Sequence, residues 1–169
     1  MPGDDTTFLL STFGVSALAG MRSMSPPALL SLYLAHRRLP AGHSLAERIS
    51  SKRARIILTT LALGEMAADK FPQAPNRTFL PALIGRAVTG GGVSGVLWSL
   101  KGRPTWIGAL GGATASVANT FLTFHLRQWL GRTLPIPHAL IWAGALEDAV
   151  IWLGGWQLLK ASDKTADTP

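Results

Sequence analysis

Ionisable side chains interrupt stretches of this chain that are otherwise apolar enough to enter a lipid bilayer. Each lies within or directly beside one of four such stretches, and the six are Arg22, Glu65, Asp69, Arg86, Glu147 and Asp148. A charge at bilayer depth is costly and is normally turned toward a protein interior or a watery cavity. We therefore expect a membrane bundle with a polar centre.

The composition agrees with a membrane protein of one domain. The chain has 169 residues, of which 47% are hydrophobic and 15% are charged, whereas soluble domains average about 25% charged residues. The chain has no cysteine, which excludes disulfides and thiolate metal sites.

The net charge of +7 is concentrated in one loop. Six of the sixteen basic residues lie in loop 37–55, namely Arg37, Arg38, Arg48, Lys52, Arg53 and Arg55. A basic loop between apolar stretches is typical of the cytoplasmic side of a membrane protein. This distribution argues against nucleic-acid binding and predicts that loop 37–55 is cytoplasmic.

The N-terminal apolar stretch, residues 8–36, is broken at its centre by Gly-Met-Arg-Ser-Met-Ser-Pro-Pro at 20–27. Ser25 suits a helix N-cap, and Pro26 suits the first helical position. Each half is shorter than the roughly 20 residues that span a bilayer, so we expect either one interrupted span or a re-entrant hairpin. Two aspartates and no basic residue precede the stretch, which predicts that it is retained rather than cleaved as a signal peptide.

Four further apolar segments complete an all-α fold, and they are residues 54–71, 79–100, 105–126 and 138–159. We predict an integral membrane helical bundle of four to five spanning helices plus the broken N-terminal element. Residues 1–160 form one domain, and residues 161–169 form a polar tail. With loop 37–55 inside, ten Lys and Arg residues fall on the inner side and four on the outer side, as the positive-inside rule requires.

Glycines four residues apart mark two of these segments as closely packing helices. The pairs are Gly91 with Gly95 and Gly108 with Gly112, a spacing that lets membrane helices approach closely. Close packing within the chain is one interpretation, and association into a homo-oligomer through these faces is the other.

A weak internal repeat relates the two halves of the chain. The broken stretch 16–39 parallels residues 109–132, and the segment that contains Glu65 parallels the one that contains Glu147. Transporters are often built from two such halves that meet near the midplane of the membrane.

Several motifs together resemble one known family. They are GMRSMSPPA at residues 20–28, GEMAADKFP at 64–72 followed by PNRT at 75–78, GR at 85–86 and LEDA at 146–149. In this order they resemble the small bacterial membrane proteins catalogued as domain of unknown function 4126, over roughly residues 10–158. The resemblance implies a multi-pass protein of the bacterial cytoplasmic membrane and transfers no biochemical activity. The long basic loop 37–55 departs from the family pattern.

The two acidic pairs can either carry chemistry or fasten the bundle. Glu65 and Asp69 share one helix face, where two like charges in a low dielectric cannot easily ionise together; such a pair can carry a proton or ligate a hard cation. Glu147 and Asp148 point about 100° apart on a helix, so each can face a different partner. The structural alternative is that all four pair with basic side chains. The excess of carboxylates over arginines favours protons or cations over anions.

The helix break offers an opposing, anion-binding interpretation. A helix that begins at Pro26 presents free N–H groups and a positive dipole end, and Arg22, Ser23 and Ser25 lie beside it. Such a site suits a carboxylate or a phosphate. In the competing interpretation Ser25 satisfies these N–H groups and Arg22 reaches one of the carboxylates.

No catalytic constellation, cofactor site or metal site is predicted. No Ser or Thr has an evident His and carboxylate partner, and the four histidines do not have metal-ligand spacing. The glycine-rich residues 85–92 lack the Gly-Lys-Ser/Thr ending of a phosphate loop.

The sequence therefore favours a small transporter or channel that moves a proton, a cation or a small solute. The expected centre comprises Arg22, Ser23, Ser25, Glu65, Asp69, Arg86, Glu147 and Asp148. The alternative is a non-transporting membrane scaffold or assembly protein in which the same charges form a structural ion-pair network. A lipid-modifying enzyme ranks third. The expected partners are the lipid bilayer and a small ion or anionic solute.

Overall fold

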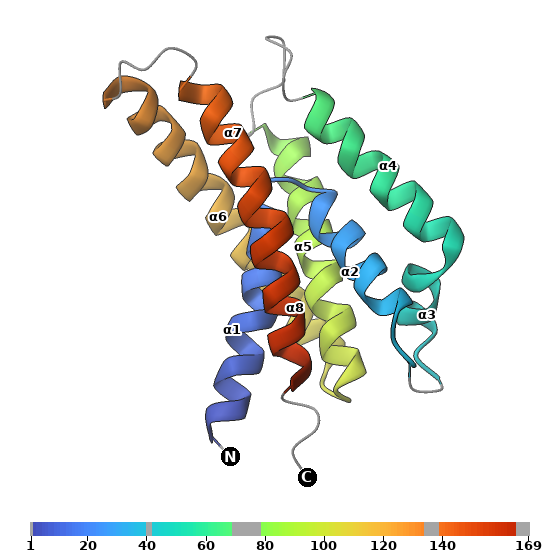
Figure 1. Cartoon of the computed structure of the whole chain (residues 1–169). Helices are drawn as coiled ribbons and strands as arrows, with labels where there is room; N and C mark the ends of the chain where they lie inside the picture. Colours follow the sequence, from blue (N-terminus) through green and yellow to red (C-terminus); the bar gives the residue numbers. More distant parts are fainter. Residues whose placement is uncertain (1, 40–41, 69–78, 134–138, 165–169) are drawn as a thin grey trace.

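The prediction of an all-α fold is confirmed in the computed structural model, which describes residues 2–39, 42–68, 79–133 and 139–164 (Figure 1). In chain order the elements are α1 (Pro2–Leu18), α2 (Ser25–Ala35), α3 (Ser44–Ser50), α4 (Lys52–Ala68), α5 (Leu80–Leu100), α6 (Thr105–Thr133), α7 (Ala139–Ala149), the π-helix η1 (Val150–Gly154) and α8 (Gly155–Lys164).

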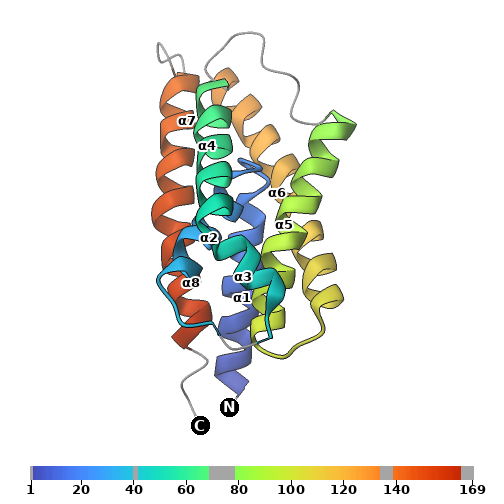
Figure 2. The same ribbon diagram turned by 90° about the vertical axis from the view of Figure 1, so that its right-hand side faces the viewer.

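The N-terminal stretch folds back on itself. α1 runs from the N-terminus into the bundle, and α2 returns toward the end at which α1 begins (Figure 1 and Figure 2). The break between them lies inside the bundle, well below the far ends of α4, α6 and α7. Of the two alternatives for residues 8–36, the structure therefore has the hairpin.

The later helices run along the bundle in alternating directions. α4 runs away from the end that holds α3, α5 returns, α6 runs away again, and the α7–η1–α8 segment returns to lie beside α1 (Figure 1). Compared in chain order, α1 runs opposite to α5, α2 runs opposite to α6, and α4 runs opposite to the α7–α8 segment. However, residues 109–132 lie in the unbroken helix α6, so their proposed likeness to the broken stretch 16–39 is wrong.

Three predicted boundaries are corrected. α6 does not end at residue 126 but continues to Thr133, because nothing in Arg127–Trp129 breaks a helix. The predicted helix 138–159 is divided by η1. The last helix does not end at residue 159, since α8 continues to Lys164 and includes the first residues of the predicted polar tail.

Within the described residues, one helix, Leu80–Leu100, is long and apolar enough to cross a membrane by length and hydropathy. The sequence predicts four to five spanning helices, but only this one of the described helices satisfies both the length and the hydropathy criterion. α4 has 17 residues, and η1 divides the last segment. In α6 glycines, hydroxyl residues and Asn119 dilute the hydropathy. Each shortfall thus has a cause in the sequence.

Small residues let α5 and α6 approach closely. A Cβ placed on Gly91 would lie 2.8 Å from the Ala109 carbonyl oxygen, and one on Gly112 would lie 2.5 Å from the Ser94 Cβ. Gly95 and Gly108 face Thr105 and Trp98 in the same contact. The two glycine pairs thus pack within the chain, and a homo-oligomer stays a prediction that would need another face.

A matched pair of glycines in α5 tests this packing. We expect Gly90→Ala to lower the free energy of unfolding by about 1–3 kcal/mol, because its Cβ would lie 2.6 Å from the Ser116 Cβ. Gly92→Ala meets nothing within 4 Å and should be neutral or stabilising by up to about 1 kcal/mol through helix propensity. Thermal unfolding of the detergent-solubilised protein measures both. Equal effects would contradict the packing account.

Candidate functional site

The break between α1 and α2 is the foundation of the candidate site. α1 ends at Leu18, and the N-cap of α2 is Met24, which makes no side-chain capping hydrogen bond. The prediction that Ser25 caps α2 is wrong. A capping side chain normally accepts from the second or third N–H of the helix, and Pro26 and Pro27 have no N–H. The Ser25 side chain is instead buried, and its hydroxyl has no hydrogen-bond partner among the described residues.

Glu65 takes over the role of a cap from another helix. Its two carboxylate oxygens accept hydrogen bonds from the backbone N–H groups of Ser23 and Met24, each at 2.8 Å. Hydrogen bonds to a charged acceptor are about twice as strong as neutral ones. Glu65 lies one turn before the end of α4, so it fastens that end of α4 to the break.

Arg22 lies at the junction of three elements. Its side chain is 3% exposed, and its Nε donates to an Asp148 carboxylate oxygen on α7. Its Nη1 also donates to the Glu65 backbone carbonyl on α4, at 3.4 Å. Arg22 therefore joins the break, α4 and α7 in a single centre.

Glu147 and Asp148 point toward different helices. Asp148 faces Arg22, whereas Glu147 accepts from both Nε and Nη2 of Arg127 on α6. Such a fork-to-fork pair fixes geometry as well as charge. Because Glu147 and Asp148 point in different directions on α7, as the sequence predicts, one reaches Arg127 and the other reaches Arg22. Glu147 and Asp148 lie just before η1. Turns of π-helix are frequent at functional sites.

The backbone of Arg86 is linked to the helix break through Ser116. Arg86 is 6% exposed, on α5, and its backbone carbonyl accepts from the Ser116 hydroxyl at 2.9 Å. Ser116 in turn lies against Gly20, two residues before Arg22, because a Cβ on Gly20 would lie 2.4 Å from the Ser116 carbonyl oxygen. Asp69 lies outside the described residues.

Two features of the site were missed from the sequence. The first is Arg127, one of the four basic residues predicted on the outer side, whose pairing with Glu147 is not predicted from the sequence. The second is a set of buried hydroxyls with no hydrogen-bond partner among the described residues, on Thr12, Ser16, Ser25 and Ser94. Thr12 and Ser16 are four residues apart on α1, and that spacing within an apolar stretch was the available signal.

The buried hydroxyls extend from the break into the bundle. Ser16 and Ser94 flank Gly112, since a Cβ there would lie 3.0 Å from the Ser16 Oγ and 2.5 Å from the Ser94 Cβ. An unpaired buried hydroxyl costs roughly 1–3 kcal/mol and calls for a functional or structural explanation. Ser16 and Ser94 thus place polar atoms where α1, α5 and α6 meet.

The surroundings of the break contain carboxylates on one side and an apolar cavity on the other. Among the described residues no three His, Asp or Glu side chains gather where they could hold a metal. A cavity of about 320 Å³ opens beside Met24 and Pro27, and its lining from α2, α4 and α5 is almost entirely apolar. The described carboxylates at the centre, Glu65, Glu147 and Asp148, each hold a hydrogen bond from another part of the chain.

No family model, no curated protein and no solved structure matches this chain. The resemblance to domain of unknown function 4126 therefore stays an expectation.

Proposed function

We propose that the chain is a multi-pass membrane protein, and its distribution of side chains supports this. Large apolar residues are exposed along α4, α5, α6 and the α7–η1 segment, among them Ile56, Leu63, Leu80, Val88, Leu110, Leu122, Leu146 and Leu153. The interior contains two buried arginines, Arg22 and Arg86, and several buried serine and threonine side chains. A protein in water rarely exposes apolar surface of this extent.

The lengths of the elements support four crossings and one hairpin. At about 1.5 Å per residue, α5, with 21 residues, and α6, with 29, measure about 32 and 44 Å. The bilayer core is about 30 Å thick. Residues 139–164 run nearly straight through η1 in Figure 1 and exceed this length too. α4, at about 26 Å, crosses most of it.

The orientation can be tested directly because the chain contains no cysteine. We expect an impermeant thiol reagent to label Thr133→Cys in intact bacterial cells and to label Ser50→Cys only after the cells are permeabilised. Ser50 lies in the basic loop and Thr133 at the opposite end of the bundle. The reverse pattern would overturn the assignment of loop 37–55 to the cytoplasm.

Within that membrane setting, we infer a transporter or channel that moves a proton, a cation or a small solute through the centre at Arg22. The observation that carries this proposal is the hydrogen bonding of Glu65 to the helix break. Broken helices inside a bundle are the sites where many transporters bind their cargo. Here a carboxylate of the chain itself occupies the anion-binding N–H groups, so its charge state controls the attachment.

The packing of α4 supports a role for this helix as the moving element. Within α4 Ala62 is the one buried residue. Cavities of about 450 and 320 Å³ lie along it, one toward α2 and one between α2 and α5. Elements with few buried contacts open at low free-energy cost. Protonation of Glu65 would weaken both hydrogen bonds to the break and release α4 at that end.

A second candidate, the structural network of a scaffold protein, is favoured by one specific observation. Glu65, Glu147 and Asp148 each already accept a hydrogen bond from another part of the chain. Such hydrogen-bonded carboxylates can hold helices together without exchanging a proton or binding an ion. The two candidates differ in whether the carboxylates must change charge state during function.

Flux in liposomes separates the two functions. We expect the reconstituted protein to carry protons, cations or small solutes and expect Glu65→Gln and Glu147→Gln to reduce that flux at least tenfold. Glu47→Gln is the matched control, because Glu47 is exposed on α3, far from the centre. If no tested solute moves, and the two centre variants only lose stability, the transport proposal fails and the scaffold remains.

A further inference from the structure

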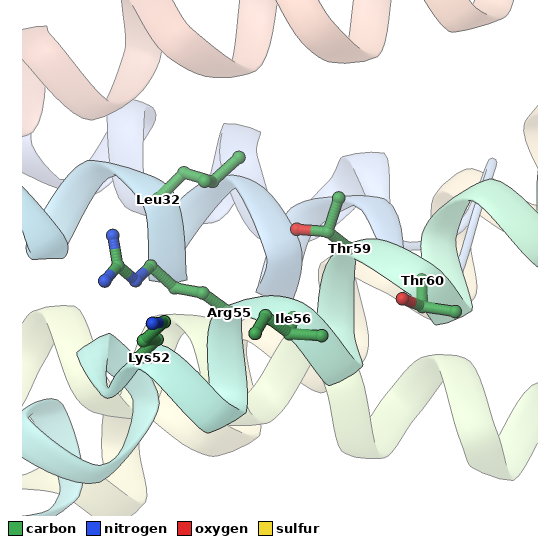
Figure 3. A pocket seen from close by; sticks show the side chains of 6 residues that line it. All are labelled: Leu32, Lys52, Arg55, Ile56, Thr59 and Thr60. Atoms are coloured by element: carbon green, nitrogen blue, oxygen red, sulfur yellow. The ribbon is translucent and has the colours of Figure 1, made fainter.

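The groove between α2 and α4 combines a basic end with an apolar wall. It has a volume of about 450 Å³ and is lined by Leu32 of α2 and by Lys52, Arg55, Ile56, Thr59 and Thr60 of α4. The α4 residues follow the spacing i, i+3, i+4, i+7 and i+8, which places them on one helix face. Figure 3 shows Lys52 and Arg55 at one end of the groove and the two threonines at the other.

Within the part of the chain that the structure describes, the basic end has no countercharge. Among the described residues no carboxylate lies within ion-pair distance of Lys52 or Arg55, and the first turn of α4 contains no acidic residue. The Arg55 Nε is buried without a hydrogen-bond partner. The N-terminus of α4, where the Ser51 hydroxyl accepts from the Ala54 N–H at 3.2 Å, adds the positive end of the helix dipole at the same place. An anion is the complement that such a site lacks.

The apolar end continues onto the outer surface of α4. Ile56 and Ile57 are more than half exposed, and Leu61 and Leu63 continue the apolar surface along the helix. In the proposed membrane orientation the basic end lies at the cytoplasmic surface. Basic pockets between helices at that level are suited to anionic head groups.

We propose that this groove binds an anionic membrane phospholipid. Its phosphate lies between Lys52 and Arg55, Thr59 and Thr60 offer hydroxyls further along the groove, and one acyl chain follows Leu32 and Ile56. The proposal rests on the membrane location argued above, but not on transport. A bound lipid would fill the space between α2 and α4 and hold the weakly packed helix in place.

The test is lipid binding by the full chain in a neutral detergent, counted by native mass spectrometry. We expect phosphatidylglycerol to bind in preference to phosphatidylcholine and expect Lys52→Gln with Arg55→Gln to weaken that binding tenfold or more. The matched control is Arg48→Gln with Arg53→Gln, which removes the same charge from the same end and should leave the binding unchanged. Equal weakening in both variants would overturn the proposal in favour of general surface charge.

A second variant separates the groove from its charge and guards against misfolding. Ile56→Trp keeps every charge, but fills the groove, and is expected to weaken phosphatidylglycerol binding as well. Unchanged binding in this variant, equal binding of phosphatidylcholine, or full displacement by millimolar inorganic phosphate would each overturn the lipid site. Selective lipid binding without any flux would contradict the transport proposal and leave the lipid site standing. Recovery of the chain in the soluble fraction without detergent would contradict the membrane location, and with it both the transport proposal and the lipid site.

Discussion

Replacing Arg22 with methionine is expected to lower the free energy of unfolding by about 3–5 kcal/mol. The substitution leaves Asp148, whose side chain is 18% exposed, without the guanidinium that now faces it. Breaking a buried pair from one side is costly because the remaining charge stays in a poor solvent. Unfolding of the detergent-solubilised protein by heat or by added denaturing detergent measures the loss.

The chain offers a matched ion pair as the control. Arg103 pairs with Asp5, which is 68% exposed, and Arg103→Met should therefore cost no more than about 1 kcal/mol. The double variant Arg22→Met with Asp148→Leu is expected to recover part of the loss, because it removes both charges together. Similar costs for Arg22→Met and Arg103→Met would show that the centre is solvated and not a buried network.

Replacing Glu65 with alanine is expected to cost about as much, at roughly 1–3 kcal/mol for each of the two N–H groups left without an acceptor. Glu65→Gln retains one carbonyl oxygen, so it should satisfy one of the two donors and lose about half as much. The order Ala, then Gln, then wild type in unfolding free energy is the signature of a two-oxygen acceptor. The exposed Glu47→Ala is the control and should change little.

If Glu65→Gln and Glu65→Ala prove equally mild, the N–H groups of Ser23 and Met24 find other partners. The role of Glu65 as a cap from a distant helix would then be wrong. Hydrogen–deuterium exchange at these two amides gives an independent reading, because loss of the acceptor should speed their exchange relative to the α5 core.

Local features of the sequence predicted the helical class, the position of the break and the involvement of the charged residues. Apolar runs and Pro-Pro are short-range signals, so they can be read without knowledge of the fold. The partners could not be read in this way. Glu65 reaches Met24 across 41 residues and Arg22 reaches Asp148 across 126, and no spacing rule links residues so far apart.

Two errors share a physical cause. Ser25 was assigned as a cap by residue type, although the proline two positions later removes an N–H that a cap would accept from. The segment 105–126 is predicted to end just before Arg127, the first charged residue after Arg103. In the fold Arg127 is compensated by Glu147, and a compensated charge does not mark an edge. In both cases the outcome depends on a carboxylate from a distant helix, which is Glu65 at the break and Glu147 beside Arg127.

The dependence of the helix break on distant helices has a consequence for the order of assembly. The α1–α2 hairpin leaves the ribosome first, yet the acceptor for its amides arrives with α4 and the carboxylate facing Arg22 arrives with α7. The hairpin therefore cannot reach its final hydrogen bonding until almost the whole chain has been synthesised. The α1–α2 hairpin is thus made before α4 and α7 but completed only after them, and its closure indicates that those two helices are in place.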